Sequence, residues 1–204
     1  MLFEDTYQTI ARPSEGLFKD RGSKFIARAF PVQSEEEVKE HLKSLRKEYY
    51  DARHHCYAYL LGFDKSAYRI NDDGEPSGTA GKPIFGQLNS HDLTNILIVV
   101  IRYFGGTKLG VSGLINAYKM TAKDAIANNQ IVTNIISYCY QIDFQYTEMN
   151  DVMKIMKAFN LEQSDQKFEM NCQLQFKVRK SESDQVYKKL SQVKSLNIKF
   201  IKTE

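Results

Sequence analysis

Residues 72–83 read DDGEPSGTAGKP and gather carboxylates, hydroxyls and glycines in a stretch without a large apolar side chain. Oxygen atoms of this kind are the ligands that hard cations prefer. The spacing is not that of an EF-hand calcium loop, which needs D-x-D-x-D-G and a distal Glu. A solvated turn whose Asp and Ser side chains bond their own backbone is the alternative. The candidate residues are Asp72, Asp73, Gly74, Glu75, Pro76, Ser77, Gly78, Thr79 and Lys82.

Residues 102–110, RYFGGTKLG, follow a continuous apolar run and open a predicted helix. Free backbone N–H groups at a helix start favour anions, and glycines allow an anion to approach closely. The segment lacks both the GxxxxGK[ST] phosphate loop and the GxGxxG dinucleotide pattern. It is therefore either a phosphate or nucleic-acid site or a glycine turn that lets a helix pack on a sheet. The candidate phosphate-binding residues are Arg102, Gly105, Gly106, Lys108 and Gly110.

His54, His55 and Cys56 enter a predicted strand directly after Arg53. Successive strand residues face opposite sides, so the two histidines are poorly placed to share one metal. His54 and Cys56 are expected on the same side, which leaves a catalytic Cys–His pair open beside a purely structural role. We take His54 and His55 as possible neighbours of the site and predict no catalytic residue, metal or cofactor.

The elements that position these residues follow from hydrophobic periodicity and turn chemistry. Ser34 predicts a helix N-cap, and the apolar run 96–101 predicts a strand buried on both faces. Thr79 is expected to cap a short helix. The predicted order is strands 6–10, 16–19 and 24–30, helix 35–50, strands 56–62 and 68–70, helix 79–88, strand 96–101 and helix 111–128.

The remaining residues predict the order β-α-β-β-α-β, which is typical of a ferredoxin-like domain. We expect a boundary near residues 130–136, dividing the chain into domains 1–132 and 136–204, and an α+β fold class overall. Tyr138, Tyr140, Phe144 and Tyr146 would form either a stacking surface for bases or a sheet core facing two helices.

The composition is that of an ordinary globular protein, with 42% hydrophobic and 26% charged residues among 204. The net charge of +3 permits contact with nucleic acid but lacks the excess of a dedicated duplex-DNA binder. Three cysteines without metal-ligand spacing argue against a disulfide framework and favour a reducing cytoplasm. Neither a signal peptide nor a membrane segment is expected, because the longest apolar run covers only residues 96–101.

Residues 51–58 (DARHHCYA), 72–83 and 100–110 (VIRYFGGTKLG) together resemble the Impact family in its bacterial YigZ-like branch. The resemblance implies an N-terminal domain like domain 2 of ribosomal protein S5 and a C-terminal domain like domain V of elongation factor G. Eukaryotic relatives modulate the starvation control of translation through an extra partner-binding domain that this chain is expected to lack. Ser112 and Asn116 depart from the family pattern, and Asn116 removes an expected arginine from the anion-binding face.

The leading hypothesis is therefore a non-enzymatic RNA- or ribosome-binding protein linked to the regulation of translation. A small-molecule phosphotransferase or metal-dependent hydrolase that uses residues 72–79 and the glycine turn is one alternative. A protein-interaction module in the stress response is the other. The oligomeric state is not predicted.

Overall fold

The structure is a computed structural model and describes residues 5–204. The chain divides into two compact units, one formed by Tyr7–Asn134 and the other by residues 5–6 with Ile135–Glu204. Both units combine helices with a sheet, so the predicted α+β class is confirmed. Within the described residues, no helix combines the length and the apolar character needed to cross a membrane.

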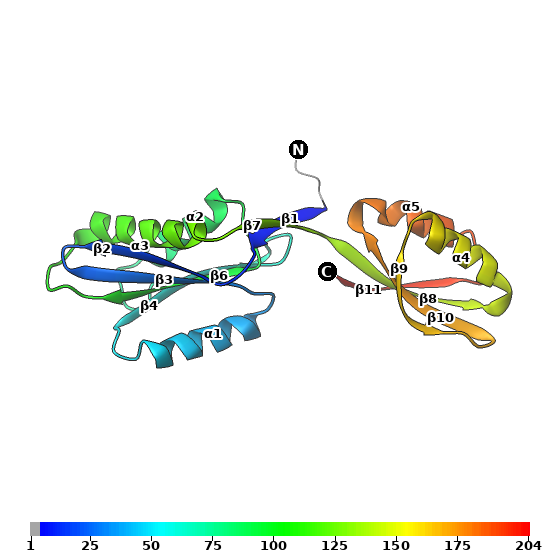
Figure 1. The fold of residues 1–204 in the computed structure, drawn as a ribbon, viewed down its shortest axis with the longest axis horizontal. Helices are drawn as coiled ribbons and strands as arrows, with labels where there is room; N and C mark the ends of the chain where they lie inside the picture. Colours follow the sequence, from blue (N-terminus) through cyan, green and yellow to red (C-terminus); the bar gives the residue numbers. More distant parts are fainter. Residues whose placement is uncertain (1–4) are drawn as a thin grey trace. The chain divides into compact units, whose positions relative to one another are not determined.

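The first unit is built on a five-stranded antiparallel sheet in the order β2-β3-β6-β4-β5 (Figure 1). The central strand is β6, and residues 96–101 within it are completely buried, as the apolar run predicts. Alternation along β6 sends its side chains into two separate cores, one on each face. The strands are β2 (Ser14–Asp20), β3 (Ser23–Pro31), β4 (His54–Leu61), β5 (Ala67–Asn71) and β6 (Ile96–Tyr103).

Helix α1 (Glu35–Glu48) covers one face of this sheet, while α2 (Gly81–Ser90) and α3 (Gly110–Ala127) cover the other (Figure 1). The predicted cap of α1 is confirmed, because Ser34 Oγ accepts a hydrogen bond from the Glu37 N–H at 3.2 Å. The short strands β1 (Thr6–Ile10) and β7 (Ile131–Ile135) pair with each other. Strand β7 thus occupies the region where the sequence predicts a domain boundary.

The second unit has the order of elements β-α-β-β-α-β and a four-stranded sheet ordered β11-β8-β10-β9, the ferredoxin-like arrangement. Phe144 is buried in the core of this unit, and Tyr138 and Tyr140 are partly buried and pack against it, as the core alternative predicts, whereas Tyr146 is 63% exposed. The elements are β8 (Ser137–Gln145), a 3₁₀ turn (Tyr146–Glu148), α4 (Met149–Ala158), β9 (Glu162–Lys167), β10 (Asn171–Arg179), α5 (Lys180–Leu190) and β11 (Asn197–Thr203).

Candidate functional site

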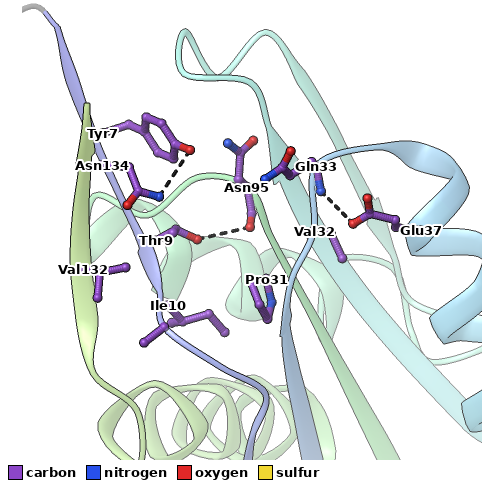
Figure 2. A pocket seen from close by; sticks show the side chains of 11 residues that line it. Tyr7, Thr9, Ile10, Pro31, Val32, Gln33, Glu37, Asn95, Val132 and Asn134 are labelled. Carbon is purple, nitrogen blue, oxygen red and sulfur yellow. Dashed lines mark hydrogen bonds between the residues drawn. The ribbon is translucent and has the colours of Figure 1, made fainter. Parts of the chain in front are cut away.

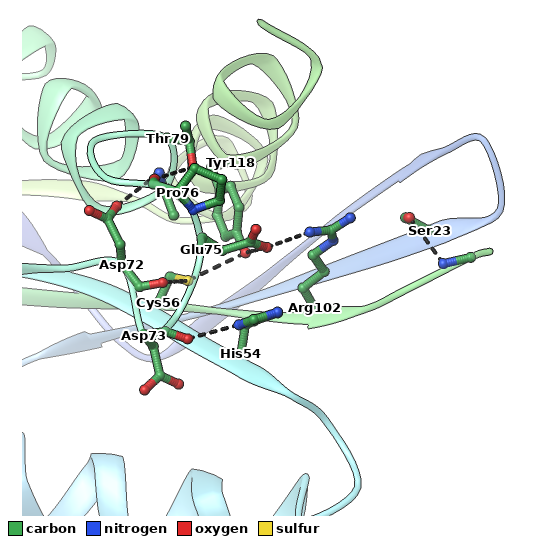
Figure 3. A network of polar contacts seen from close by, with 12 residues as sticks. Ser23, His54, Cys56, Asp72, Asp73, Glu75, Pro76, Thr79, Arg102 and Tyr118 are labelled. Carbon is green, nitrogen blue, oxygen red and sulfur yellow. Dashed lines mark hydrogen bonds and ion pairs between the residues drawn. The ribbon is translucent and has the colours of Figure 1, made fainter. Parts of the chain in front are cut away.

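The two chemically rich segments meet at one end of the sheet face that α2 and α3 cover (Figure 3). Strands β4 and β6 are neighbours, and their register places His54 opposite Arg102. The loop that follows β5 folds over these strand ends and brings Glu75 to Arg102. Sequence positions separated by dozens of residues therefore form one site.

A buried carboxylate lies at the centre of the site. The side chain of Glu75 is only 3% exposed, and that of Arg102 is 8% exposed. Arg102 Nη1 donates to Glu75 Oε1 at 2.6 Å, and the Tyr118 hydroxyl donates to the same oxygen at 2.8 Å. Removing either charge of a buried pair leaves the other charge buried without a partner. This contact therefore fixes the position of the loop relative to β6 and α3.

Cys56 and Tyr118 extend this network into the core. Cys56 Sγ donates to the carbonyl oxygen of Asp72 at 2.9 Å and lies 3.3 Å from the Tyr118 hydroxyl. Burial raises the pKa of both the Cys56 thiol and the Tyr118 hydroxyl, so both groups stay protonated at neutral pH. A protonated thiol is a poor nucleophile, and Cys56 is a packing residue in this arrangement.

His54 and His55 lie on opposite faces of β4, as strand alternation predicts. His54 Nδ1 lies 2.8 Å from the carbonyl oxygen of Asp73, so this nitrogen donates to the loop backbone. His55 is 3% exposed, and burial lowers the pKa of its imidazole. Among residues 5–204, His55 Nε2 has no hydrogen-bond partner.

Asp72 performs the capping role that the sequence predicts for Thr79. Its Oδ1 accepts from the N–H groups of Ala80 at 3.1 Å and Gly81 at 2.8 Å, and its Oδ2 accepts from Gly78 at 2.8 Å. Burial acts to raise the pKa of Asp72, but these N–H groups outweigh it and the pKa is lowered. The prediction for Thr79 is wrong, because its hydroxyl donates to the Pro76 carbonyl at 2.6 Å instead.

Asp73 joins the loop to α1 and β4. Its Oδ2 accepts from the His55 backbone N–H at 2.7 Å, and its Oδ1 accepts from Arg46 Nη2 at 2.9 Å. Burial acts to raise the pKa of Asp73, but the His55 N–H and the Arg46 guanidinium lower it overall. Gly74 follows with φ +87°, in the left-handed region that favours glycine.

No group of three or more His, Cys, Asp or Glu side chains in residues 5–204 is arranged to hold a metal ion. The three carboxylates of the loop instead bond to backbone N–H groups, to arginines and to a tyrosine. Of the other loop residues, Pro76 lines the cavity described below, whereas Ser77 and Lys82 are exposed outside its lining.

The glycine turn needs glycine for two different reasons: Gly105 packs closely against a neighbouring backbone, whereas Gly106 and Gly110 have positive φ angles. Gly105 donates its N–H to Ser23 Oγ at 3.1 Å, and a Cβ on Gly105 would lie 1.9 Å from the carbonyl carbon of Gly22. Gly106 and Gly110 have φ +87° and +75°, with open space where a Cβ would lie. The N–H of Gly105 is therefore occupied, while the backbone around Gly106 and Gly110 faces free space.

A cavity of about 500 Å³, which we call the α3 cavity, opens between these segments. Arg53, His54 and Lys108 supply polar groups, and Arg53 and Lys108 are exposed. Helix α3 begins beside the cavity with neither a side-chain cap nor an acidic residue in its first turn, so its first N–H groups favour an anion. The other lining residues are Glu75, Pro76, Arg102, Phe104, Leu109, Gly110, Val111 and Leu114.

A second hollow of about 500 Å³ lies where β1 and β7 approach the end of β3 (Figure 2). Several of its polar groups already bond to one another. Thr9 Oγ1 donates to the Asn95 carbonyl at 3.1 Å, and Asn134 Nδ2 lies 3.3 Å from the Tyr7 hydroxyl. The predicted site residues do not line it, and we therefore place the candidate site at the α3 cavity.

The site residues Arg53, Phe104 and Tyr118 are missing from the predicted site. Tyr118 falls on the inner face of the predicted helix, and a buried tyrosine hydroxyl needs a partner, which is a signal for a nearby acceptor. Phe104 lies within the glycine turn but is 53% exposed, and its type alone does not distinguish a core residue from a surface one.

The protein is a two-unit α+β protein. Its candidate site is the α3 cavity of the first unit, which has polar groups at its opening. Residues 21–126 match the family model described as the Impact N-terminal domain, and this match includes both segments of the site. The chain therefore belongs to the Impact family, and the resemblance noted from its motifs is confirmed.

Relatives and solved structures agree with this assignment. A Bacillus subtilis protein named IMPACT family member YvyE is 33% identical over 147 residues, which cover 72% of this chain and 68% of that protein. The Escherichia coli IMPACT family member YigZ is 38% identical over 126 residues, or 60% of this chain and 62% of that protein. A crystal structure described as a hypothetical protein has a TM-score of 0.73 at 27% identity and covers 97% of this chain and 98% of its own.

Proposed function

We propose that this protein is a non-enzymatic, cytoplasmic RNA- or ribosome-associated factor linked to the regulation of translation. The α3 cavity is the observation that supports this function most directly. It combines two exposed cations at its mouth with the uncapped N-terminus of an 18-residue helix. A phosphate there would accept from free N–H groups and neutralise Arg53 and Lys108, which is the usual chemistry of RNA backbone contact.

Some residues of the site would contact the phosphate directly, and others would hold the site in shape. Arg53 and Lys108 would contact phosphate oxygens, and Gly106 and Gly110 would let the backbone of the ligand approach. Arg102 would act differently from a mobile surface cation, because Glu75 holds its guanidinium within the protein. Replacing Arg102 would disturb the core as well as the cavity, so Arg53 and Lys108 are the better first targets.

The test is RNA binding across salt concentrations. Fluorescence anisotropy of a labelled RNA stem-loop would compare the wild type with R53A/K108A and with the control K43A/K47A. The control removes two exposed lysines from α1, on the opposite face of the sheet. We expect weaker binding only for R53A/K108A. The slope of the logarithm of the binding constant against the logarithm of the salt concentration should become shallower by about 1.4, because two single-strand phosphate contacts are lost.

Unchanged affinity and slope in the folded R53A/K108A variant would contradict the proposal. Sedimentation of the tagged protein with cell lysate extends the test to ribosomal particles. Comigration that ribonuclease and salt abolish supports the RNA function. Association with a protein that resists both treatments favours the protein-interaction alternative instead.

A further inference from the structure

We propose that the α3 cavity takes the base of an unpaired RNA nucleotide, whose flanking phosphates lie at Arg53 and Lys108. This inference rests on the proposed RNA-binding function and specifies the part of the RNA that the site recognises. The volume of about 500 Å³ is in the range of small-molecule sites, roughly 300–1,000 Å³. Phosphate contact alone needs only a charged surface and does not explain a cavity behind the cations.

The walls of the α3 cavity are mainly apolar. Leu109, Val111 and Leu114 line it from the start of α3, and Pro76 and Phe104 line it from the two loops. Phe104 is 53% exposed, so its ring is an aromatic surface that the protein itself leaves partly uncovered. Unpaired bases stack on such rings, whereas bases within a duplex are already stacked and paired.

Arg102 supplies the polar feature that a base edge would meet. Its guanidinium carbon lies 5.4 Å from the centre of the Phe25 ring and 5.6 Å from that of Phe104. Glu75 occupies Nη1, but Nε is buried and has no hydrogen-bond partner in residues 5–204. An unsatisfied buried donor is costly, and a guanidinium can only donate.

Every RNA base has acceptor atoms on its edges, so a base that entered the cavity could receive hydrogen bonds from Arg102. Phe104 lies against the same guanidinium and would have to shift or stack on the base for this contact to form. The ring, the donor and the cationic mouth together match the face of a base, its edge and the flanking phosphates. A single-stranded segment or a loop is therefore the expected ligand.

The experiment compares three probes by anisotropy or calorimetry: a short single-stranded RNA of mixed sequence, the same RNA annealed to its complement, and guanosine 5′-monophosphate. We expect the duplex and the mononucleotide to bind at least about tenfold more weakly than the single strand, because the duplex lacks an accessible base and the mononucleotide has only one of the two flanking phosphates. Phe104→Ala should weaken single-strand binding about tenfold without changing the salt slope, since it removes stacking and no phosphate contact.

Phe104→Leu keeps an apolar side chain but removes the ring, so it should bind as weakly as Phe104→Ala. Tyr68→Ala is the matched control, because Tyr68 is 59% exposed in the same unit and does not line the α3 cavity. Equal affinity for duplex and single strand, or wild-type binding by both Phe104 variants, would overturn this inference alone if R53A/K108A still loses affinity. Mononucleotide binding as tight as that of the strand would also overturn it, and binding of none of the RNA probes would overturn the proposed function as well.

Discussion

The two loops that border the α3 cavity use their charged residues in opposite ways. The loop after β5 has three carboxylates, and all three bond to the protein itself: Glu75 to Arg102, Asp72 to backbone N–H groups, and Asp73 to the His55 N–H and to Arg46. The turn after β6 has one lysine, and Lys108 is exposed at the mouth of the cavity. The denser set of ionisable groups therefore maintains the architecture, while the sparse cation is the group available to a ligand.

Glu75→Ala gives the largest expected effect on the inward-facing side of this comparison. The substitution leaves Arg102 buried without its counter-charge, and we expect the free energy of unfolding of the Tyr7–Asn134 unit to fall by about 3–5 kcal/mol. Urea unfolding followed by circular dichroism measures it, since the chain has no Trp for fluorescence.

The control for this prediction is the double variant Glu75→Gln/Arg102→Met, which removes both charges. It should recover part of the lost stability, because neither partner is left as an isolated buried charge. A loss smaller than about 1 kcal/mol for Glu75→Ala would mean that the carboxylate is free to leave the core.

Gly105→Ala tests the one part of the glycine turn that belongs to the architecture. The added Cβ would lie 1.9 Å from Gly22 C, so the backbone must move and we expect a loss of about 3 kcal/mol. The matched change Gly106→Ala meets open space and costs only the left-handed backbone conformation, about 1 kcal/mol. Equal losses in urea unfolding would refute the distinction between the packing glycine and the free one.

Asp72→Ala removes the distant cap of α2 and should lower the free energy of unfolding by about 2 kcal/mol at neutral pH. The pKa of Asp72 in the folded protein is below its ordinary value of 3.8. Its contribution is therefore present above about pH 4 and is lost as the pH falls through the folded pKa. The difference between wild type and variant should shrink in acid, and a constant difference across the titration would show that the carboxylate does not act as an ionised cap.

Several parts of this arrangement were predictable from local patterns. The apolar run of β6 and the Ser34 cap of α1 depend on neighbouring residues, and the structure confirms both. The partners of Glu75 and Asp72 were not predictable in this way, because they depend on how the loop folds over strands and helices. Composition predicts for residues 72–79 either a metal site or a solvated turn whose Asp and Ser side chains bond their own backbone. Asp72 does bond the backbone of its own loop, whereas Asp73 and Glu75 bond to β4 and Arg102.

Lys108→Ala gives the smallest expected effect on stability and tests the outward-facing side of the comparison. Lys108 precedes the first residue of α3 by two positions, where its charge opposes the positive end of the helix dipole. Its removal should therefore leave the free energy of unfolding unchanged or raise it by about 0.3 kcal/mol. Lys43→Ala, on the opposite face of the sheet, is the control and should change stability by less than about 0.5 kcal/mol.

If Lys108→Ala destabilised the protein as Glu75→Ala does, Lys108 would be part of the architecture, and the division between the two loops would fail. A cation kept where it is electrostatically unfavourable in the free protein is what a phosphate site requires, because the bound anion offsets both the lysine and the helix terminus.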